Sequence, residues 1–303
     1  MKPIVVVGSI NMDLVTQAER IPRAGETITG TDFQIHSGGK GANQAVAVAK
    51  LGHPCVLLGA VGEDVFGETL LRTLSAYGVD IRNVRHVSGS SGTASIIVNS
   101  HAENCIVVTP GSNAHVSVAY LEANEKLIRD AGIVLVQLEI PIESVEWVVN
   151  CCAAHRIPVM LDPAPARALS PKILRSVEWF TPNQTEAEFY AGDAHPADAV
   201  VEKLFAMGIR NLILKRGAEG ALIADSRGGR AWTPAFEVAA RDTTAAGDAF
   251  NGAFAVGVMR GMPLPECGHF AAAAAAIAVT RCGAQPSLAT QEEVTAFMAA
   301  AAR

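Results

Sequence analysis

Short runs of β-branched and other apolar residues alternate with longer segments of helical periodicity along most of this chain. Such runs, bounded by polar or glycine residues, are typical of buried parallel strands. They occupy residues 4–7, 56–58, 133–138, 158–161 and 212–214. Helical patterns lie between and after them at residues 41–51, 66–77, 118–129, 142–155 and 185–191, and three more follow at 249–260, 263–281 and 290–302.

This alternation strongly constrains the fold. Consecutive parallel strands need a crossover connection, and these crossovers are right-handed, so helices come to cover both faces of the sheet. We therefore predict an α/β fold of three layers, α/β/α, built on a mostly parallel sheet.

Two segments interrupt the alternation. Residues 13–37 mix strand-forming residues with proline and glycine, and residues 92–109 have the pattern of a hairpin, with strands at 93–99 and 105–109. We predict that they form a small β-sheet lid over the ligand-binding edge, with ordinary surface loops as the alternative. The larger α/β domain then comprises residues 1–12, 38–91 and 110–303.

Composition narrows the partners that such a protein would have. The net charge is −6 without any block of lysine or arginine, which argues against nucleic acid or a membrane surface as partner. The longest apolar run, residues 270–279, is too short to cross a bilayer, and residues 1–13 lack the pattern of a signal peptide. Six cysteines without a Cys-x-x-Cys pair indicate thiols in a reducing cytoplasm. The edge strands of the predicted lid could pair with those of a second copy across a two-fold axis, which predicts a homodimer; a monomer is the alternative.

The most informative motif is residues 242–248, a turn of small residues that ends in Asp248 and runs into a helical pattern. The first N–H groups of a helix lack intrahelical partners, and the helix dipole makes that end suitable for phosphate or an oxyanion. An aspartate there could accept a proton from a hydroxyl while the amides hold a phosphoryl group. The alternative is that Asp248 is simply an N-cap.

A second cluster, residues 37–43, contains three glycines with Lys40 and Asn43 at the start of the next helix. Glycines let the backbone approach a ligand closely, and the two side chains supply donors. The spacing is not that of a P-loop. A glycine-rich helix cap with a solvated lysine is the alternative.

Polar residues follow two of the predicted strands. Asn11 and Asp13 come after the first strand, and Glu139 comes after residues 133–138. Ligands of parallel sheets gather at the carboxyl ends of strands, where these side chains could hold the hydroxyl groups of a sugar. Each residue alone is more typical of a turn or cap.

Two further turns could border a nucleotide. Asn183 and Glu186 open a helix, where they could organise a hydrated magnesium ion or form a capping arrangement. Residues 215–220 are a glycine-rich turn after a strand, which alone indicates only a strand connection. Gly-x-Gly-x-x-Gly, Gly-x-Ser-x-Gly and His-Glu-x-x-His are absent, so dehydrogenase, hydrolase and zinc-enzyme hypotheses have little support.

Taken together, these motifs resemble those of the ribokinase-like family of carbohydrate kinases. The strongest are residues 38–44, 181–186 and 242–248, and the similarity runs from residues 8–13 to residues 283–287. The resemblance implies transfer of the γ-phosphoryl group of ATP to the 5-hydroxyl of D-ribose, with Mg²⁺ and K⁺ as cofactors. The alternatives are a fructokinase- or adenosine kinase-type enzyme for another sugar or a nucleoside, and a sugar- or nucleotide-binding regulator without catalysis.

The resemblance also implies roles for single residues. Asp248 would be the general base, and Ala245, Ala246 and Gly247 would form the anion hole. The sugar would be held by Asn11, Asp13, Gly39, Lys40, Asn43, Glu139 and Asp248. ATP would be bordered by Asn183, Lys215, Gly217, Ala218, Gly220 and Gly247, with Glu186 organising Mg²⁺ indirectly. The matching K⁺ positions are Asp242, Thr244, Ala278, Arg281, Gly283 and Ser287.

Two positions depart from the family pattern. Asp162 stands where the pattern begins with asparagine, and residues 271–276 are all alanine, without a histidine or asparagine near the expected adenine edge. The second departure leads us to expect loose selectivity for the nucleotide base.

Overall fold

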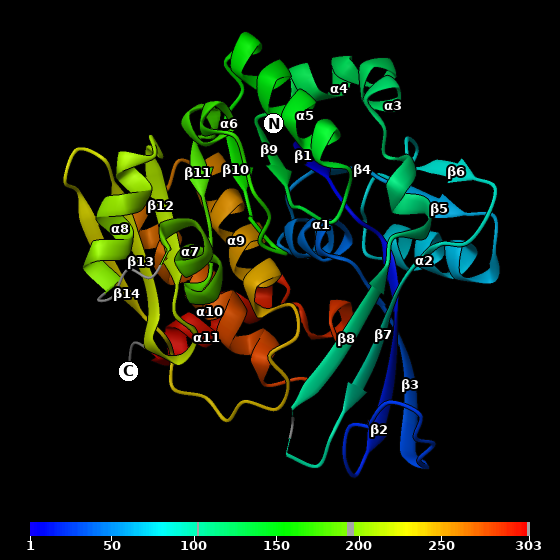
Figure 1. The fold of residues 1–303 in the computed structure, drawn as a ribbon. Coiled ribbons are helices and arrows are strands. Elements are labelled where there is room, and N and C mark those ends of the chain that lie inside the picture. The colour runs from blue at the N-terminus through cyan, green and yellow to red at the C-terminus, as the bar shows by residue number, and fades with distance from the viewer. Residues whose placement is uncertain (102, 193–196, 302–303) are drawn as a thin grey trace.

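The computed structural model describes residues 1–101, 103–192 and 197–301 of the chain. It contains an eight-stranded sheet between two layers of helices and a four-stranded sheet that projects from the side of this body (Figure 1). All six cysteines are free thiols. Within the described part of the chain, every helix is too short or too polar to cross a membrane.

The eight-stranded sheet is parallel except at one edge. Its order is β14-β13-β12-β11-β10-β9-β1-β4, and β13 runs antiparallel to both of its neighbours, β12 and β14. The strands are β1 (Ile4–Val7), β4 (Cys55–Leu58), β9 (Ile133–Val136), β10 (Val159–Leu161), β11 (Trp179–Phe180), β12 (Asn211–Lys215), β13 (Gly220–Asp225) and β14 (Arg230–Pro234). All five predicted strands are present, with ends that differ by at most two residues, and β11, β13 and β14 add to them.

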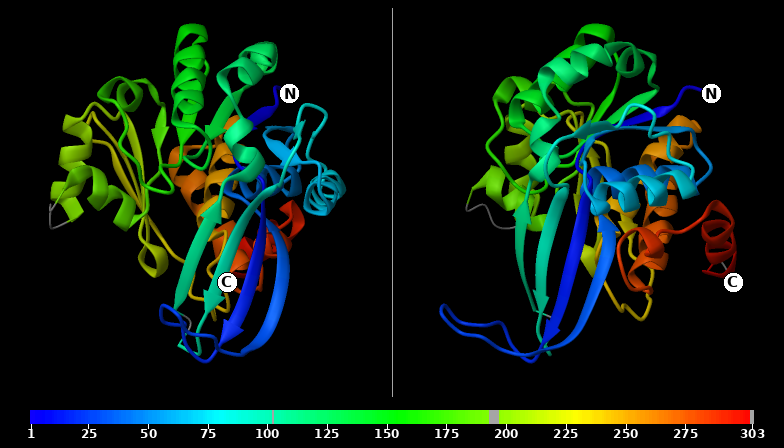
Figure 2. Two further views of the ribbon diagram at one scale, coloured as in Figure 1. Left: turned by 45° about the vertical axis from the view of Figure 1, so that its right-hand side comes forward. Right: turned by 90° about the vertical axis from the view of Figure 1, so that its right-hand side faces the viewer.

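Helices cover both faces of this sheet, which confirms the predicted three-layer fold (Figure 2). In β1, Ile4 and Val6 pack against one layer and Val5 and Val7 against the other, and all four are fully buried. Complete burial of such a side chain contributes about 1.5–3 kcal/mol. The first layer contains α1 (Lys40–Lys50), α9 (Ala246–Met259) and α10 (Leu264–Val279), with α2 (Val65–Ala76) and α11 (Gln291–Ala301) beside them. The second contains α3 (Val118–Ala123), α4 (Glu125–Asp130), α5 (Ile142–His155), α6 (Pro171–Ser176), α7 (Gln184–Ala191) and α8 (Ala197–Ala206).

One helix prediction was wrong. The expected single helix over residues 118–129 is two short helices, α3 and α4, which meet at Asn124. The side-chain amide of Asn124 donates to the carbonyl of Tyr120 at 2.9 Å. Asparagine competes with the helix backbone for hydrogen bonds in this way, which explains the break. Helices α6 and α8 were not predicted, and residue 302 of the last predicted helix lies outside the described residues.

The two interrupting segments pair with each other in the four-stranded sheet, in the order β3-β2-β7-β8. Its strands are β2 (Asn11–Ala18), β3 (Gly30–Gly38), β7 (Gly92–Val98) and β8 (Asn104–Thr109). The hairpins β2–β3 and β7–β8 are antiparallel, and β2 joins β7 in parallel. A small two-stranded sheet, β5 (Ala60–Gly62) with β6 (Arg85–Val87), lies near its base.

Candidate active site

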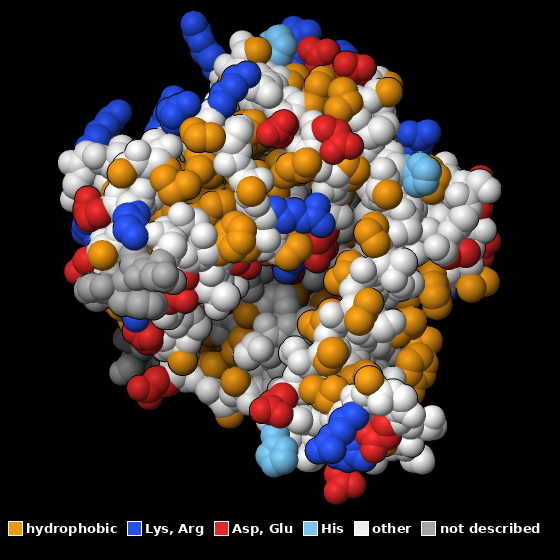
Figure 3. Space-filling model, in the orientation of Figure 1, with side chains coloured by type: hydrophobic (Ala, Val, Ile, Leu, Met, Phe, Trp, Pro, Cys, Tyr) orange, Lys and Arg blue, Asp and Glu red, His pale blue; other side chains and the backbone are white. Residues whose placement is uncertain are grey.

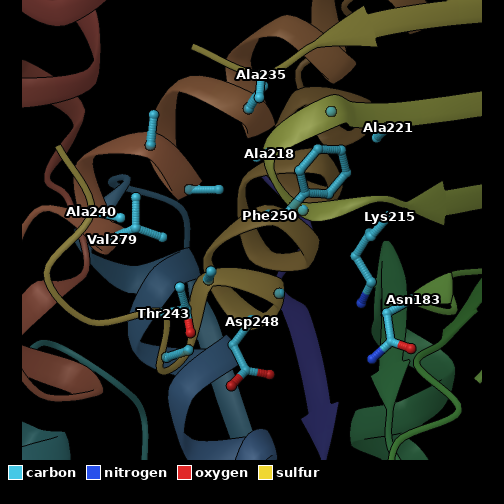
Figure 4. A pocket seen from close by; sticks show the side chains of 18 of the residues that line it. Asn183, Lys215, Ala218, Ala221, Ala235, Ala240, Thr243, Asp248, Phe250 and Val279 are labelled. Atoms are coloured by element: carbon cyan, nitrogen blue, oxygen red, sulfur yellow. The ribbon is translucent and has the colours of Figure 1, made fainter. Parts of the chain in front are cut away.

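A cavity of about 670 Å³ opens at the carboxyl end of the parallel strands. Ligands of open α/β sheets bind at this edge. The space-filling view shows a hollow between the four-stranded sheet and the body (Figure 3). The cavity is lined by the start of α9, by Lys40 of α1, and by Asp162, Asn183 and Lys215 from successive strand ends. Figure 4 shows Lys215 and Asn183 on one wall and Asp248 on another.

The turn before α9 exposes the amino end of that helix to the cavity. Ala245 is the N-cap and has a left-handed backbone, with φ 59°. That conformation costs a non-glycine residue about 1–2 kcal/mol. The N–H of Ala246 donates to the carbonyl of Thr243 at 3.2 Å, and Gly247 follows on the cavity wall. The three residues predicted for the anion hole therefore lie together at a helix N-terminus.

Asp248 is the third residue of α9 and is only 6% exposed. Its carboxylate accepts hydrogen bonds from Asn43 Nδ2 at 3.0 Å and from Gln44 Nε2 at 3.1 Å. Burial raises the pKa of Asp248 to about 6, against the opposing effect of the Lys40 ammonium. A carboxyl group with this pKa is mostly ionised at neutral pH yet holds a proton more readily than a surface aspartate. Such a group suits a general base.

The glycine-rich loop places α1 directly against the end of β1. Gly39 has φ 89°, and a Cβ atom there would lie 2.7 Å from the backbone nitrogen of Asn11. At Gly41 a Cβ atom would lie 2.6 Å from the carbonyl carbon of Gly8. Only glycine permits this approach of two backbones. The loop thereby brings Lys40 to the cavity and Asn43 to Asp248.

Of the residues predicted at the strand ends, Glu139 lies close enough to Asp13 for its charge to act on that carboxyl group. Burial, then the charges of Glu139 and Asp248, raise the pKa of Asp13 to about 7. Glu139 accepts hydrogen bonds from Ser9 Oγ and from the backbone N–H of Lys40. Burial alone would lower the pKa of Lys40. The surrounding carboxylates, led by Asp248 and Glu139, outweigh that effect and raise the pKa above its ordinary value. These residues form one polar region next to the cavity, whose lining includes Lys40 and Asp248 but not Asn11, Asp13, Gly39, Asn43 or Glu139.

A chain of buried side chains connects Asp248 to Asp162. Gln44 Nε2 lies between them, 3.0 Å from Asp162 Oδ2 and 3.1 Å from Asp248 Oδ1. Gln44 Oε1 accepts from Gln137 Nε2 at 2.6 Å, so the donor end of Gln44 must face the carboxylates. The other oxygen of Asp162 pairs with Lys215 Nζ at 3.1 Å. The position that departs from the family pattern is therefore part of the site, as the ion-pair partner of Lys215.

Asn183 and Glu186 form a capping box at the start of α7. The backbone N–H of Glu186 donates to Asn183 Oδ1 at 2.9 Å, and the N–H of Asn183 donates to Glu186 Oε2 at 2.8 Å. The capping alternative is thus correct, and both residues also line the cavity. Burial, with the charge of Asp162, raises the pKa of Glu186 above its ordinary value.

The far end of the cavity is walled mostly by small apolar side chains. The turn after β12 contributes through Gly217 and Gly220, both with positive φ. The apolar lining residues are Ala218, Ala221, Ala235, Phe236, Val238, Ala240, Phe250, Ala272, Ala275, Ala276 and Val279. Figure 4 shows several of these side chains facing one another across the space.

Part of the predicted K⁺ set comes together behind the anion-hole turn. Asp242 accepts from the backbone N–H of Thr244 at 2.9 Å and of Gly283 at 2.8 Å. Burial alone would raise the pKa of Asp242, but these hydrogen bonds lower it below its ordinary value. The guanidinium of Arg281 instead pairs with Glu293 at 2.6 Å, and the hydroxyl of Ser287 donates to the carbonyl of Ala284 at 2.7 Å. Ala278 is buried in α10. Because the side chains of Arg281 and Ser287 are engaged in these contacts, only the backbone carbonyls of the two residues are left to bind an ion.

Sequence reasoning missed Gln44, Gln137 and Asn113. Gln44 follows Asn43 directly in the glycine-rich motif, which is a local signal. The other two approach the site only through contacts with residues about one hundred positions away: Gln137 contacts Gln44, and Asn113 contacts Ile10 and Asn11.

This combination of an α/β body, a glycine-rich loop and an aspartate at a helix N-terminus defines a class of sugar-phosphorylating enzyme. The family model described as "pfkB family carbohydrate kinase" matches residues 1–291. The chain belongs to this family of carbohydrate kinases.

Within the family the chain is similar to several ribokinases. It is 40% identical to a ribokinase from Schizosaccharomyces pombe, covering 96% of each chain. A structure of Arabidopsis thaliana ribokinase complexed with ribose and ATP is 33% identical, has a TM-score of 0.90, and is matched over 98% of each chain. A deoxyribokinase from Salmonella typhimurium is 35% identical over 97% of this chain and 98% of its own length.

Proposed function

We infer that this chain is an ATP-dependent kinase that transfers the γ-phosphoryl group to the 5-hydroxyl of D-ribose, giving D-ribose 5-phosphate and ADP. The observation that carries this inference is the place of Asp248, between the polar region around Asp13 and Glu139 and the helix N-terminus of α9. The test is to incubate the protein with ATP, Mg²⁺ and ribose and to measure ADP. Ribose-dependent ADP formation supports the inference, and its absence refutes it.

We propose that Asp248 acts as general base. Phosphoryl transfer proceeds through a loose in-line transition state, so catalysis consists mainly of positioning and charge stabilisation. Asp248 needs only to accept the hydroxyl proton as the oxygen attacks phosphorus. The backbone of Ala245, Ala246 and Gly247 would stabilise the transferring group, because the amino end of α9 carries partial positive charge. The N–H of Ala246 would have to exchange its bond to the carbonyl of Thr243 for one to a phosphoryl oxygen.

The sugar would bind at the polar region of the cavity. Carboxylates accept hydrogen bonds from hydroxyl groups, and the ammonium of Lys40 and the amide groups donate them. Asp13 and Glu139 supply the acceptors. The full proposed set is Asn11, Asp13, Gly39, Lys40, Asn43, Glu139 and Asp248.

ATP would lie along the opposite wall, bordered by Asn183, Lys215, Gly217, Ala218, Gly220 and Gly247. Mg²⁺ fits the oxygen donors on this wall, because the carboxylates of Glu186 and Asp162 lie close enough for the charge of Asp162 to raise the pKa of Glu186. One oxygen of Glu186 is held by the N–H of Asn183, which orients the other. Bound Mg²⁺ would neutralise charge on the phosphates, and Glu186 would hold it through water.

A monovalent cation would act on the anion-hole turn without touching substrate. Asp242 already ties residues 242–244 to Gly283, so an ion there would fix the same turn that presents Ala245 and Gly247. We expect activity to rise when K⁺ replaces tetramethylammonium at equal ionic strength. Equal rates in both salts would remove K⁺ from the proposal.

The four-stranded sheet would act as a lid and as the contact between two copies of the chain. Water competes with the sugar for the phosphoryl group, so a lid that excludes it favours transfer. Several large apolar side chains on the outer strands are about half exposed, which supports a protein contact. They are Phe33 and Ile35 of β3 and Ile106, Val107 and Val108 of β8. A monomer in sedimentation equilibrium at micromolar concentration would contradict the dimer.

The second candidate is a kinase whose best acceptor is 2-deoxyribose, which the similarity to a deoxyribokinase supports. The two functions differ in one hydroxyl group of the acceptor. Comparison of kcat/KM for ribose, 2-deoxyribose, fructose and adenosine decides between them, and we expect ribose to give the highest value.

A further inference from the structure

Asn113 is a buried amide that contacts the start of the four-stranded sheet from outside it. It lies in the 3₁₀ helix Gly111–His115, which follows β8, and is 1% exposed. Its Oδ1 accepts from the backbone N–H of Ile10 at 2.9 Å, and its Nδ2 donates to the carbonyl of Ile10 at 3.2 Å. The same Nδ2 donates to Asn11 Oδ1 at 2.7 Å. All three bonds converge on the passage from β1 to β2.

These bonds determine which way round both amides lie. The N–H of Ile10 can only donate, so the atom of Asn113 that it meets must be the oxygen. The NH₂ group of Asn113 then faces Asn11, and the atom of Asn11 that accepts it must also be the oxygen. The NH₂ group of Asn11 is therefore the end left for a ligand.

Gly92 leaves the space that this amide pair needs. It is the first residue of β7 and is paired with Asn11 in the sheet. A Cβ atom at position 92 would lie 2.2 Å from Asn113 Nδ2 and 2.3 Å from Asn11 Oδ1. The two amides thus occupy the volume in which any other residue would place its side chain.

We propose that Asn113 is a positioning residue for the sugar: it holds the amide of Asn11 so that the NH₂ group donates to a hydroxyl oxygen of the acceptor. This role rests on the proposed function, in which Asn11 binds the sugar. Asn113 itself acts through Asn11, without contact to the reacting atoms, and its bonds to Ile10 fix its own orientation.

The principal test is Asn113→Asp, which keeps the size of the side chain and one acceptor for the N–H of Ile10. The second oxygen of the new carboxylate would face Asn11 and would have no proton to donate. Asn11 would therefore turn its NH₂ group towards this carboxylate and its oxygen towards the sugar. We expect KM for ribose to rise about tenfold or more, because a hydrogen bond is lost and a mismatch replaces it. KM for ATP should stay within about twofold, as expected for sites that do not share partners.

Asn11→Ala and the double variant Asn11→Ala/Asn113→Asp complete the experiment. If Asn113 acts through Asn11, the second substitution changes KM for ribose by less than about twofold once Asn11 is absent, which is the signature of coupled residues. If the two effects multiply in full, the positioning role is overturned while the sugar site stands. If Asn11→Ala alone leaves KM for ribose unchanged, the assignment of Asn11 to the sugar site fails, and the positioning role fails with it.

Gly92→Ala provides a second route if Asn113→Asp does not fold. It retains both amides and displaces them by volume alone. We expect KM for ribose to rise and KM for ATP to stay constant, with folding checked by the thermal unfolding midpoint. An unchanged KM for ribose in a folded Gly92→Ala variant would contradict the proposal.

Discussion

The proposed sugar-binding end, where Lys40 and Asp248 meet the cavity, gathers charged and hydrogen-bonded side chains, whereas the far end of the cavity is lined by the methyl groups of alanines. At the first end the charges of Glu139 and Asp248 raise the pKa of both Asp13 and Lys40. At the other, Ala272, Ala275 and Ala276 of α10 line the space. A site that must satisfy buried polar groups rejects a wrong ligand strongly, and an apolar pocket does so only weakly. The enzyme should therefore discriminate between sugars far more than between nucleotide bases.

The largest effect expected at the polar end is that of Asp248→Asn. Removal of a general base costs about 10²–10⁴-fold in rate, and the asparagine keeps the size of the side chain. We expect this loss in kcat, measured by ADP formation at saturating ribose and ATP. Asp248→Asn with near-normal kcat would show that another group accepts the proton.

Asp13→Asn should impair sugar binding but increase the stability of the ligand-free protein at high pH. Loss of a charged hydrogen-bond partner costs about 1.5–3 kcal/mol, or roughly 10–100-fold in KM for ribose. The pKa of Asp13 in the folded protein is about 7, above its ordinary 3.8. The folded state therefore binds this proton more tightly, and ionisation destabilises it as pH rises from about 4 to about 7.

Thermal unfolding measures this second effect. The variant should melt above the parent at pH 8 and close to it at pH 4. Asp32→Asn, at an exposed carboxylate on the neighbouring strand β3, is the matched control and should change neither KM nor the pH dependence. Equal unfolding midpoints for Asp13→Asn and its parent at pH 8 would contradict the buried, proton-holding carboxyl group.

Asp162→Asn should shift the pH profile rather than abolish activity. Besides burial, the negative charge of Asp162 raises the pKa of Asp248, and Asp162 also pairs with Lys215. Without that charge, the acid limb of kcat/KM against pH moves to lower pH. Glu122→Gln, at an exposed position on α3, is the control and should leave the limb in place. A shift to higher pH would mean that Asp162 does not act on Asp248 by its charge.

The smallest effect is expected at the alanine-lined end. GTP should replace ATP with a kcat/KM within about tenfold, which corresponds to the lower end, about 1 kcal/mol, of the discrimination that an apolar pocket provides. Initial rates with each nucleotide at fixed ribose measure this ratio. Strict dependence on ATP would show that backbone groups read the base, and the contrast between the two ends would disappear.

The sequence predicted the parallel body of the fold well because its strands are short, apolar and separated by helices. The sequence did not predict β13 or β14. Strand β14 is partly exposed and ends at Pro234, so it has neither an apolar run nor a strict alternation of apolar and polar residues. The sequence missed β11 because two residues are too few to form a pattern. It joined α3 to α4 because apolar periodicity continues across Asn124.

Lys40, Asn43 and Asp248 could be proposed from the sequence because they lie in compact motifs. The structure places Lys40 and Asp248 on one cavity, with Asn43 in contact with Asp248. The roles of Gln44 and Asn113 could not be predicted, since they depend on which distant side chains the fold places beside them. Gln44 contacts Asp248 across 204 positions of sequence, and Asn113 contacts Asn11 across 102.

The most direct measurement is a crystal structure of the protein with ribose and a non-hydrolysable ATP analogue. We predict a carboxylate oxygen of Asp248 at hydrogen-bond distance from the 5-hydroxyl, about 2.6–3.2 Å, with the γ-phosphoryl mimic facing the amino end of α9. A 5-hydroxyl beyond the reach of Asp248, directly or through one water, would contradict the central claim.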